Sequence, residues 1–364
     1  MYKIEKLQVT NFRNLTNDII EFSPKINCIL GENGNGKTNI LEAIHVLVNK
    51  KSFRKNTSFP QYLSIDGEQP EIIFSSIFKK DKNIKSVSGK IYSKSNEWYV
   101  DGKPSKKKIE SKCVFINPFD SYNFHNTPSF RRDWFNQHFS DLSSDYKQTL
   151  KTYNQTLRFR NNLLSKKPSK YLEQIKIIDK DLSKLSVSLT NLRIFYIKEL
   201  EKYSINTFKQ IFSEDHELTI NLDSKVIGMD EEAVFNLLQN NIQKDLIIGH
   251  TSYGVHKDDY VLLFDSFNSY DYCSLGQQKM SYLSLLFAYI ELFRYNFVSY
   301  PIVLIDDVSG ELDKFRWRKL IDYLEARDFQ VLITTANEKF REELERIEGA
   351  RRILVESGSI KSLN

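Results

Sequence analysis

Eight consecutive residues near the N-terminus have the types and the spacing of a phosphate-binding loop. Residues 31–38 read Gly-Glu-Asn-Gly-Asn-Gly-Lys-Thr, and this segment satisfies the pattern G-x-x-x-x-G-K-[ST] at every fixed position. In such a loop the glycines let successive backbone N–H groups point at phosphate oxygens, the lysine reaches the β- and γ-phosphates, and the hydroxyl contacts Mg²⁺. The sequence therefore predicts a site for ATP or GTP. Its binding residues would be Gly31, Glu32, Asn33, Gly34, Asn35, Gly36, Lys37 and Thr38.

Two carboxylates that could complete this site follow an apolar run in the last third of the chain. Residues 302–305 are Ile-Val-Leu-Ile, a pattern typical of a buried strand, and Asp306 and Asp307 come directly after them. In a nucleotide site Asp306 would bind Mg²⁺ through water, and Asp307 would orient or deprotonate the attacking water. Acidic residues also cap many ordinary strand ends, so this prediction depends on the loop at residues 31–38.

A third feature, Ser274 with Gly276 at the start of an expected helix, has the chemistry of a second phosphate cradle. Backbone N–H groups and the positive end of a helix dipole both favour an anion there. One chain has no local use for a second cradle, so we expect Ser274 and Gly276 to cap the ATP of a second copy. That is the arrangement of ABC ATPases, whose heads sandwich two ATPs between two subunits. The alternative is a serine N-cap on an ordinary helix.

The elements that must position these residues alternate between strands and helices at both ends of the chain. A short apolar segment, Ile26–Leu30, precedes the loop, and an amphipathic segment follows it. Residues 72–115 are typical of strands and hairpins, with a turn at Asp101 and Gly102. In the last third, expected strands at 302–306 and 330–335 enclose an expected helix at 315–326. This order predicts an α/β fold in which helices cover both faces of a parallel or mixed sheet.

The middle of the chain has a different character. Between Arg131 and Phe212 there is no glycine and one proline, Pro168. Apolar residues recur there at spacings of three and four, as in a coiled-coil seam; they are Ile175, Ile178, Leu182, Leu185, Leu189, Leu192 and Tyr196. Two interpretations remain open: an antiparallel helical hairpin broken at residues 165–169, or two ordinary helices of a globular lobe. We expect an ATPase head of residues 1–130 and 245–364, interrupted by a helical lobe of residues 131–244.

Composition excludes several classes of protein. The 364 residues include 52 basic and 47 acidic side chains, which gives a net charge of +5. Three distant cysteines (Cys28, Cys113 and Cys273) exclude a disulfide scaffold and a cysteine zinc site, and favour a reducing cytoplasm. No run of 18 apolar residues is present, so we expect no membrane-spanning segment.

Clusters of basic residues are compatible with a nucleic-acid partner. They lie at residues 79–85, at Lys103 with Lys106, Lys107 and Lys108, at Arg131 and Arg132, and at Lys166, Lys167 and Lys170. If they share a face they would bind DNA through its phosphates, without reading sequence; singly, each is typical of a solvated turn or helix end. His256 with Asp258 and Asp259 lacks a further metal ligand at useful spacing, so we expect this group to line the ATP or DNA surface.

Together these motifs resemble the bacterial RecF family, DNA-repair relatives of the SMC-type ABC ATPases. The matching segments are 11–14, 31–39 with 41–44, 52–54, 115–120, 131–132, 256–259, 274–278, 306–308 with 311–313, and 333–335. The resemblance implies an ABC-type head, ATP-dependent dimerisation on single-strand-gapped or duplex DNA, weak DNA-stimulated ATP hydrolysis, and recombinational repair and replication restart with RecR, RecO and RecA. It also implies that Arg13 and Asn39 contact the nucleotide, that residues 311–313 cross between subunits, and that Thr334 or Thr335 senses the γ-phosphate.

Some positions depart from the usual RecF pattern, although none removes a phosphate or metal ligand. They are Asn117 for serine, Asn136 for aspartate, Val255 for proline, Lys257 for arginine and Leu275 for glutamine. A transporter ATPase would need a Leu-Ser-Gly-Gly-Gln signature and a switch histidine, and this chain has neither at Ser274 or Thr334. A RecF-like ATPase subunit of a phage-defence or other DNA-processing system, acting with a separate nuclease, remains an alternative.

Overall fold

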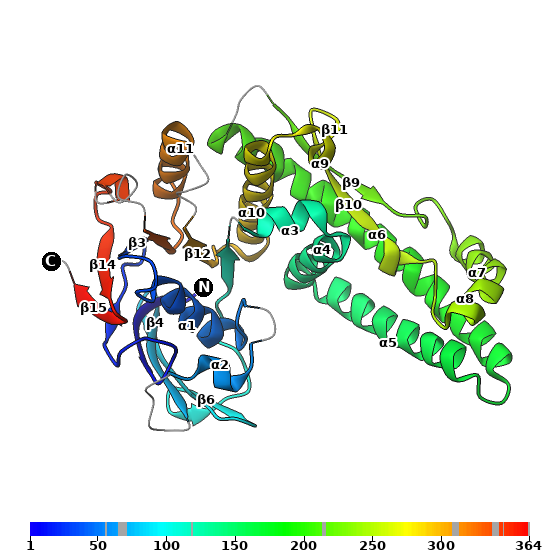
Figure 1. Cartoon of the computed structure of the whole chain (residues 1–364), viewed down its shortest axis with the longest axis horizontal. Helices are drawn as coiled ribbons and strands as arrows, with labels where there is room; N and C mark the ends of the chain where they lie inside the picture. Colours follow the sequence, from blue (N-terminus) through cyan, green and yellow to red (C-terminus); the bar gives the residue numbers. More distant parts are fainter. Residues whose placement is uncertain are drawn as a thin grey trace. The chain divides into compact units, whose positions relative to one another are not determined.

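The computed structural model describes residues 1–54, 57–64, 71–117, 119–212, 216–307, 313–336, 342–344 and 346–362. The chain divides into two compact units (Figure 1). Unit 1 combines Met1–Phe119 with Phe293–Asn364, and unit 2 is the continuous segment Asp120–Leu292. From composition we expected the divisions after residues 130 and 244. Residues 245–292 fall in unit 2 because a strand at Asp259–Phe264 pairs with one at Leu218–Asp223. The assignment of ATPase head and helical lobe to these parts stays a prediction.

The described residues of unit 1 form two six-stranded sheets. The first has the order β2-β1-β4-β5-β6-β7 with antiparallel neighbours throughout. Its strands are β1 (Lys3–Thr10), β2 (Ile20–Glu21), β4 (Ile72–Lys80), β5 (Asn83–Ile91), β6 (Asn96–Val100) and β7 (Lys103–Pro104). Asp101 and Gly102 join β6 to β7 with φ of 51° and 73°. Positive φ at both central residues is the geometry of a tight hairpin turn, which confirms the predicted turn.

The second sheet carries the predicted site residues. Its order is β15-β14-β3-β13-β12-β8, and all neighbours are parallel except β14 and β15. Its strands are β3 (Ile26–Leu30), β8 (Cys113–Ile116), β12 (Ile302–Asp306), β13 (Val331–Thr335), β14 (Arg351–Glu356) and β15 (Ser359–Ser362). The carboxyl ends of β3, β12 and β13 meet at one edge, since Asp306 is in register with Thr334 and Thr335 with Leu30. The predicted parallel sheet is confirmed.

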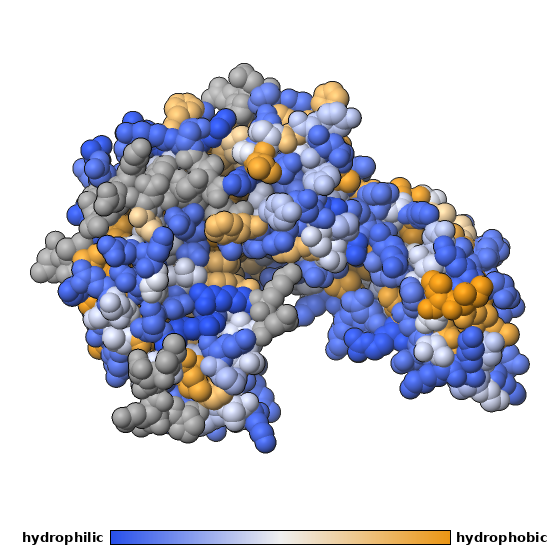
Figure 2. Space-filling model, viewed as in Figure 1, coloured by the Kyte–Doolittle hydropathy of each residue, from blue (hydrophilic) through white to orange (hydrophobic). Residues whose placement is uncertain are grey.

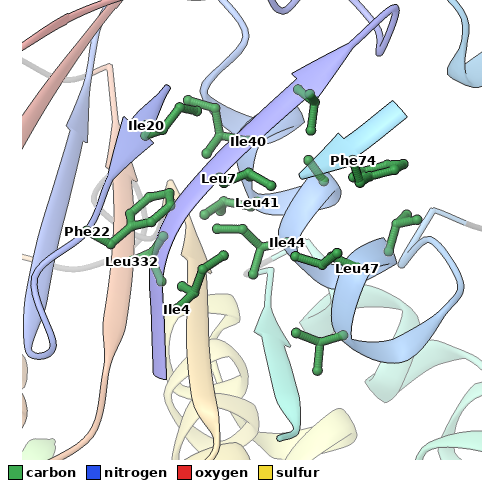
Figure 3. Packing of buried hydrophobic residues seen from close by; sticks show 14 of the residues in the cluster. Ile4, Leu7, Ile20, Phe22, Ile40, Leu41, Ile44, Leu47, Phe74 and Leu332 are labelled. Atoms are coloured by element: carbon green, nitrogen blue, oxygen red, sulfur yellow. The ribbon is translucent and has the colours of Figure 1, made fainter. Parts of the chain in front are cut away.

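Helix α1 (Lys37–Asn49) packs into a core that both sheets of unit 1 share. Figure 3 shows Ile40, Leu41, Ile44 and Leu47 of this helix among Ile4 and Leu7 of β1, Phe74 of β4 and Leu332 of β13. We expected an amphipathic helix, but residues 40–48 are all buried. Other parts of unit 1 therefore cover α1 on every side, and each buried leucine or isoleucine contributes about 1.5–3 kcal/mol. Unit 1 also contains α2 (Phe59–Tyr62) and α11 (Lys314–Glu325).

Unit 2 is built on two long helices and a small sheet. Its helices are α3 (Asp120–Asn126), α4 (Pro128–Leu142), α5 (Ser144–Lys166), α6 (Tyr171–Ile211), α7 (Glu231–Asn240), α8 (Ile242–Ile248), a 3-10 turn (Val255–Lys257), α9 (Ser269–Tyr272) and α10 (Leu275–Phe297), whose last residues belong to unit 1. Its strands β9 (Leu218–Asp223), β10 (Asp259–Phe264) and β11 (Phe267–Asn268) form an antiparallel sheet of order β11-β10-β9. The sheet was not predicted.

Helices α5 and α6 form a hairpin that is packed into a lobe, so both interpretations of the middle segment hold in part. Leu163 and Leu164 of α5 form an apolar cluster with Ile175 of α6, against which α8 packs. Beside it the Arg160 guanidinium forms ion pairs with Asp179 and Asp245, both at 2.6 Å, and all three side chains are at most 1% exposed. The predicted apolar seam of α6 is thus interrupted by a buried charge with its own partners.

The surface of unit 2 carries an apolar patch. Figure 2 shows it over the part of the unit where α7 and α8 lie, and α8 exposes Ile247 (86%) and Ile248 there.

Among the described residues, no helix has the length and apolar character needed to cross a membrane.

Candidate functional site

The loop between β3 and α1 is curled by glycines with positive φ. These angles are 150° at Gly31, 83° at Gly34 and 103° at Gly36. A Cβ atom would lie 2.4 Å from the Val355 carbonyl oxygen at Gly31 and 2.7 Å from Asn14 Oδ1 at Gly36. Other residues would therefore strain the backbone and also clash. The loop ends at the N-terminus of α1, where free N–H groups and the helix dipole favour a phosphate.

Lys37 is anchored inside this loop. Its Nζ donates hydrogen bonds to the carbonyl oxygens of Gly31 and Glu32, both at 2.9 Å. Burial lowers the pKa of Lys37, and the nearby carboxylates of Asp307 and Asp306 oppose that shift. The ammonium thus lies within the curl of the loop, while Glu32, Asn33 and Gly34 are exposed at its rim.

Thr38 and Asp306, 268 positions apart in the sequence, are brought into direct contact. Thr38 Oγ1 donates to the two carboxylate oxygens of Asp306 at 2.9 and 3.0 Å, and Thr334 Oγ1 donates to Oδ1 at 2.7 Å. Burial raises the pKa of Asp306, and the two hydroxyl donors oppose that shift. A hydroxyl and a carboxylate side by side are the hard oxygen donors that Mg²⁺ prefers, so this pair fits the predicted metal.

The two candidate sensors of the γ-phosphate, Thr334 and Thr335, are the last residues of β13, and Asp307 directly follows β12. Asp307 has φ of 45°, and its backbone N–H donates to Thr334 Oγ1 at 3.1 Å. Side chains alternate along a strand, so Thr335 points to the opposite face from Thr334. The structure therefore places the Thr334 hydroxyl between the Asp306 carboxylate and the Asp307 N–H. Sensing of the γ-phosphate by Thr334 or Thr335 stays a prediction. Residues 308 and 311–312 of the matching segment lie outside the described residues, and Asp313 caps α11 by accepting from the Arg316 N–H at 2.9 Å.

Glu42 organises a polar network behind the loop that the sequence did not reveal. Its carboxylate is fully buried and accepts from Arg13 at 2.9 and 3.0 Å and from Ser52 Oγ at 2.6 Å, with Arg54 at 3.3 Å. Arg54 also donates to Asn39 Oδ1 at 2.9 Å. Arg13 and Asn39 are thus engaged with protein groups, and their contacts with a nucleotide stay predictions. The sequence feature that could have revealed this network is the carboxylate of Glu42 within the otherwise apolar run of α1.

We expect Glu42→Gln to lower the free energy of unfolding by about 3 kcal/mol, because it leaves two arginines without their buried counter-charge. Urea denaturation measures this loss. Glu21→Gln is the control, since Glu21 pairs with Lys6 and Arg351 at the surface, where solvent screens both pairs, and this variant should lose far less stability than Glu42→Gln. Equal losses in the two variants would contradict the role given to Glu42.

Ser274 forms the N-cap of α10. Its Oγ accepts from the Gln277 N–H at 3.3 Å, and Gln277 Oε1 accepts from the Ser274 N–H at 2.9 Å, the reciprocal pattern of a capping box. Ser274, Leu275 and Gly276 are nevertheless exposed. The serine therefore caps its own helix and also leaves the helix N-terminus accessible to another molecule. Ser274 belongs to unit 2 and the phosphate-binding loop to unit 1.

The expectation that His256, Asp258 and Asp259 line a ligand surface is wrong for Asp258. That carboxylate is 3% exposed and pairs with Arg193 at 2.6 Å, while Asp259 pairs with Arg131 at 2.7 Å. His256 is held between Tyr153 Oη at 2.9 Å and the Thr251 carbonyl oxygen, and burial lowers its pKa to about 4. Each side chain is engaged inside unit 2.

Two of the unusual residues of the sequence lie in this same network. The Val255 carbonyl oxygen accepts from Arg193 at 2.8 Å, and Asn136 Oδ1 accepts from Tyr146 Oη at 2.6 Å. These departures therefore concern the interior of unit 2 and not the phosphate-binding loop.

The basic clusters differ in how far they are already paired. Arg131 is bound by Asp259, Arg132 donates to the Asp258 carbonyl oxygen at 3.1 Å, and Lys79 lies 3.8 Å from Glu5. In contrast, Lys166, Lys167 and Lys170 are exposed at the turn between α5 and α6.

Comparison with known proteins identifies the family of this chain. Residues 3–356 match the family described as "RecF/RecN/SMC N terminal domain". The chain is 31% identical over 325 residues to the DNA replication and repair protein RecF of Lachnoclostridium phytofermentans, covering 88% of this chain and 89% of the relative. It is 29% identical over 368 residues to the protein of the same name from Clostridium kluyveri, covering 99% and 100%.

Solved structures agree with this result. The structure titled "recombination mediator protein RecF-ATP in RecFOR pathway" superposes with a TM-score of 0.85 at 25% identity, covering all of this chain and 98% of the other. A Pyrococcus furiosus Smc head domain superposes with a TM-score of 0.59 at 15% identity, covering 100% and 96%, which shows the fold alone. The predicted α/β fold of an ABC-type ATPase head is confirmed, and the chain belongs to the RecF family.

Proposed function

We propose that this protein is an ATP-dependent DNA-binding protein of recombinational repair and replication restart. One observation carries the ATP part of the proposal: a curled glycine loop holds the Lys37 ammonium next to the contact between Thr38 and Asp306. Membership of the RecF family carries the DNA part.

In the proposed reaction the residues of the loop and the two aspartates have separate roles. The backbone N–H groups of residues 31–36 bind phosphate oxygens, and Lys37 exchanges its two carbonyl partners for the β- and γ-phosphates. Thr38 and Asp306 would hold Mg²⁺, which would supply positive charge against the phosphates. Asp307, whose backbone is fixed by Thr334, orients or deprotonates the attacking water.

The second part of the proposal is an ATP-dependent homodimer. Ser274 and Gly276 would cap the triphosphate bound by the partner copy, through the exposed N-terminus of α10. A Cβ at Gly276 would meet only Ser274 Oγ, at 4.0 Å, so the space beside this helix end is open. Hydrolysis would then require two copies, whereas ATP binding would require one.

The proposed macromolecular partners are DNA, bound by its backbone, and RecR, with RecO and RecA in the same pathway. The solved relative is described as a recombination mediator protein in the RecFOR pathway. We assign the same pathway to this chain because it belongs to the same family. The exposed turn with Lys166, Lys167 and Lys170 is the candidate phosphate contact in unit 2.

A salt series with gapped, duplex and single-stranded DNA, each with and without ATP, tests the DNA part. We expect ATP to raise the affinity, and log K to fall with log salt concentration by about 0.9 per neutralised phosphate. Replacing Lys166, Lys167 and Lys170 by glutamine should reduce the magnitude of this slope by about 2 to 3. Lys79→Gln is the control, because Lys79 is already near Glu5. Affinity independent of both salt and ATP would contradict the proposal.

A further inference from the structure

We propose that the hairpin of β14 and β15 holds the phosphate-binding loop in its curled shape, and that Asn14 is a positioning residue for ATP. The hairpin acts through Asn14, Thr16 and Asp18, here called the bracket. This inference rests on the proposed ATP binding at residues 31–38, and it assigns a role to segments outside that motif.

Asn14 ties the middle of the loop to the first turn of α1. Its Nδ2 donates to the Gly34 carbonyl oxygen at 3.0 Å, and its Oδ1 accepts from Asn39 Nδ2 at 2.7 Å. The same Oδ1 lies where a Cβ of residue 36 would come within 2.7 Å, so Gly36 packs directly on the Asn14 amide. Donor and acceptor of one side chain therefore fix two points of the loop.

The C-terminal hairpin in turn fixes the bracket. The Gly358 carbonyl oxygen accepts from the N–H and the Oγ1 of Thr16, both at 3.0 Å. Asp18 Oδ2 accepts from the Ile360 N–H at 2.8 Å and from Ser359 Oγ at 3.0 Å. The first of these bonds is the main reason why the pKa of Asp18 is lowered, so the carboxylate is ionised and its hydrogen bonds are of the stronger, charge-assisted kind.

The hairpin also touches the loop directly. The Gly358 N–H donates to the Asn35 carbonyl oxygen at 3.0 Å, and the Val355 carbonyl oxygen lies against Gly31. The loop is thus supported at its first residue, at Gly34 and at Asn35 by segments near the two ends of the chain.

Such support matters because glycine loses more conformational freedom on ordering than any other residue. A loop with three positive-φ glycines would otherwise be ordered only at the moment of binding, and this cost would reduce affinity. The hairpin and the bracket orient the N–H groups beforehand. Disturbing them should weaken phosphate binding even though no residue of the motif changes.

Gly358→Ala tests the hairpin. Gly358 has φ of 82°, and a Cβ there would lie 1.7 Å from the Asn14 carbonyl oxygen, so the turn must move away from the bracket. We expect the Kd for ATP to rise at least about tenfold. Gly349→Ala is the matched control, since Gly349 has φ of 72° and nothing within 4 Å of the added atom. It incurs the same backbone strain, and its Kd should stay within about twofold.

Asn14→Ala tests the bracket without adding any atom, and it keeps the proposal testable if Gly358→Ala fails to fold. We expect the KM for ATP to rise about tenfold while kcat at saturating ATP stays within about twofold, because Lys37, Thr38 and Asp306 are untouched. Its melting temperature without nucleotide should equal that of Asn17→Ala, the control, which loses only an exposed hydrogen bond from Thr10 Oγ1. A merely structural role would lower the melting temperature and leave the KM unchanged.

The outcomes separate this inference from the proposed function. Absence of ATP binding by the unsubstituted protein would overturn both. ATP binding that neither Asn14→Ala nor Gly358→Ala weakens beyond its control would overturn the inference alone.

Discussion

Lys37→Met is expected to abolish ATP-dependent dimerisation and to weaken ATP binding at least about 100-fold. The substitution removes two charge-assisted hydrogen bonds to the triphosphate, each worth about 1.5–3 kcal/mol. Lys37→Arg should fail similarly, because a planar guanidinium does not reproduce a compact ammonium. The fold should survive, since the hydrogen bonds of Lys37 Nζ within the described part of the chain go to two carbonyl oxygens of the loop itself, those of Gly31 and Glu32.

Sedimentation velocity with and without ATP measures the dimer, and calorimetric titration measures binding. Lys25→Met is the matched control, because Lys25 is exposed and directly precedes β3, at the end of the strand opposite to the loop. An ATP-induced dimer of unchanged stability in Lys37→Met would show that the loop at residues 31–38 is not what joins the two copies.

Ser274→Arg should separate ATP binding from ATP hydrolysis. One copy should still bind ATP with a Kd within about twofold of the unsubstituted protein, because Ser274 and the phosphate-binding loop belong to different units. The ATP-induced dimer and turnover should both be lost, because a long cationic side chain would occupy the place of the partner's triphosphate.

Loss of a helix cap alone must be distinguished from loss of the dimer. Ser143→Arg provides the control, since Ser143 caps α5 by accepting from the Tyr146 N–H at 3.1 Å. Both variants should lose about 1 kcal/mol of stability, and only Ser274→Arg should lose turnover. Normal ATP hydrolysis by Ser274→Arg would rule out a cradle acting on the second copy.

The sequence pointed to the edge of unit 1 where Thr38 meets Asp306 because phosphate and Mg²⁺ chemistry is restrictive. The nucleotide and metal roles of these residues stay predictions. Few residue types can line a phosphate or hold Mg²⁺, so the spacing of Lys37 and Thr38 and the position of Asp306 identified partners far apart in the chain. Parallel pairing of β12 with β13 and β13 with β3 then brings them to one edge, as the strand and helix order indicated.

Buried polar networks could not be predicted in the same way. Arg160 interrupts an apolar pattern, but the pattern does not say that Asp179 and Asp245 neutralise it. Glu42 and Asp258 have the same ambiguity: a single carboxylate in a sequence gives no sign of the arginine that will meet it. The contact of Thr334 with Asp306 follows from the pairing of β12 with β13. The hydrophobic pattern alone leaves open which residue of a strand buried on both faces makes such a contact.

The division of the chain has a consequence for its synthesis. Unit 2 is continuous, so all of its contacts are available while the ribosome is still translating the last segment. The strand β3 and the phosphate-binding loop, made near the beginning, wait unpaired for β13 and β14. The sheet around β3 can therefore form only after β13 and β14 have been translated, so unit 2 is able to fold earlier than unit 1.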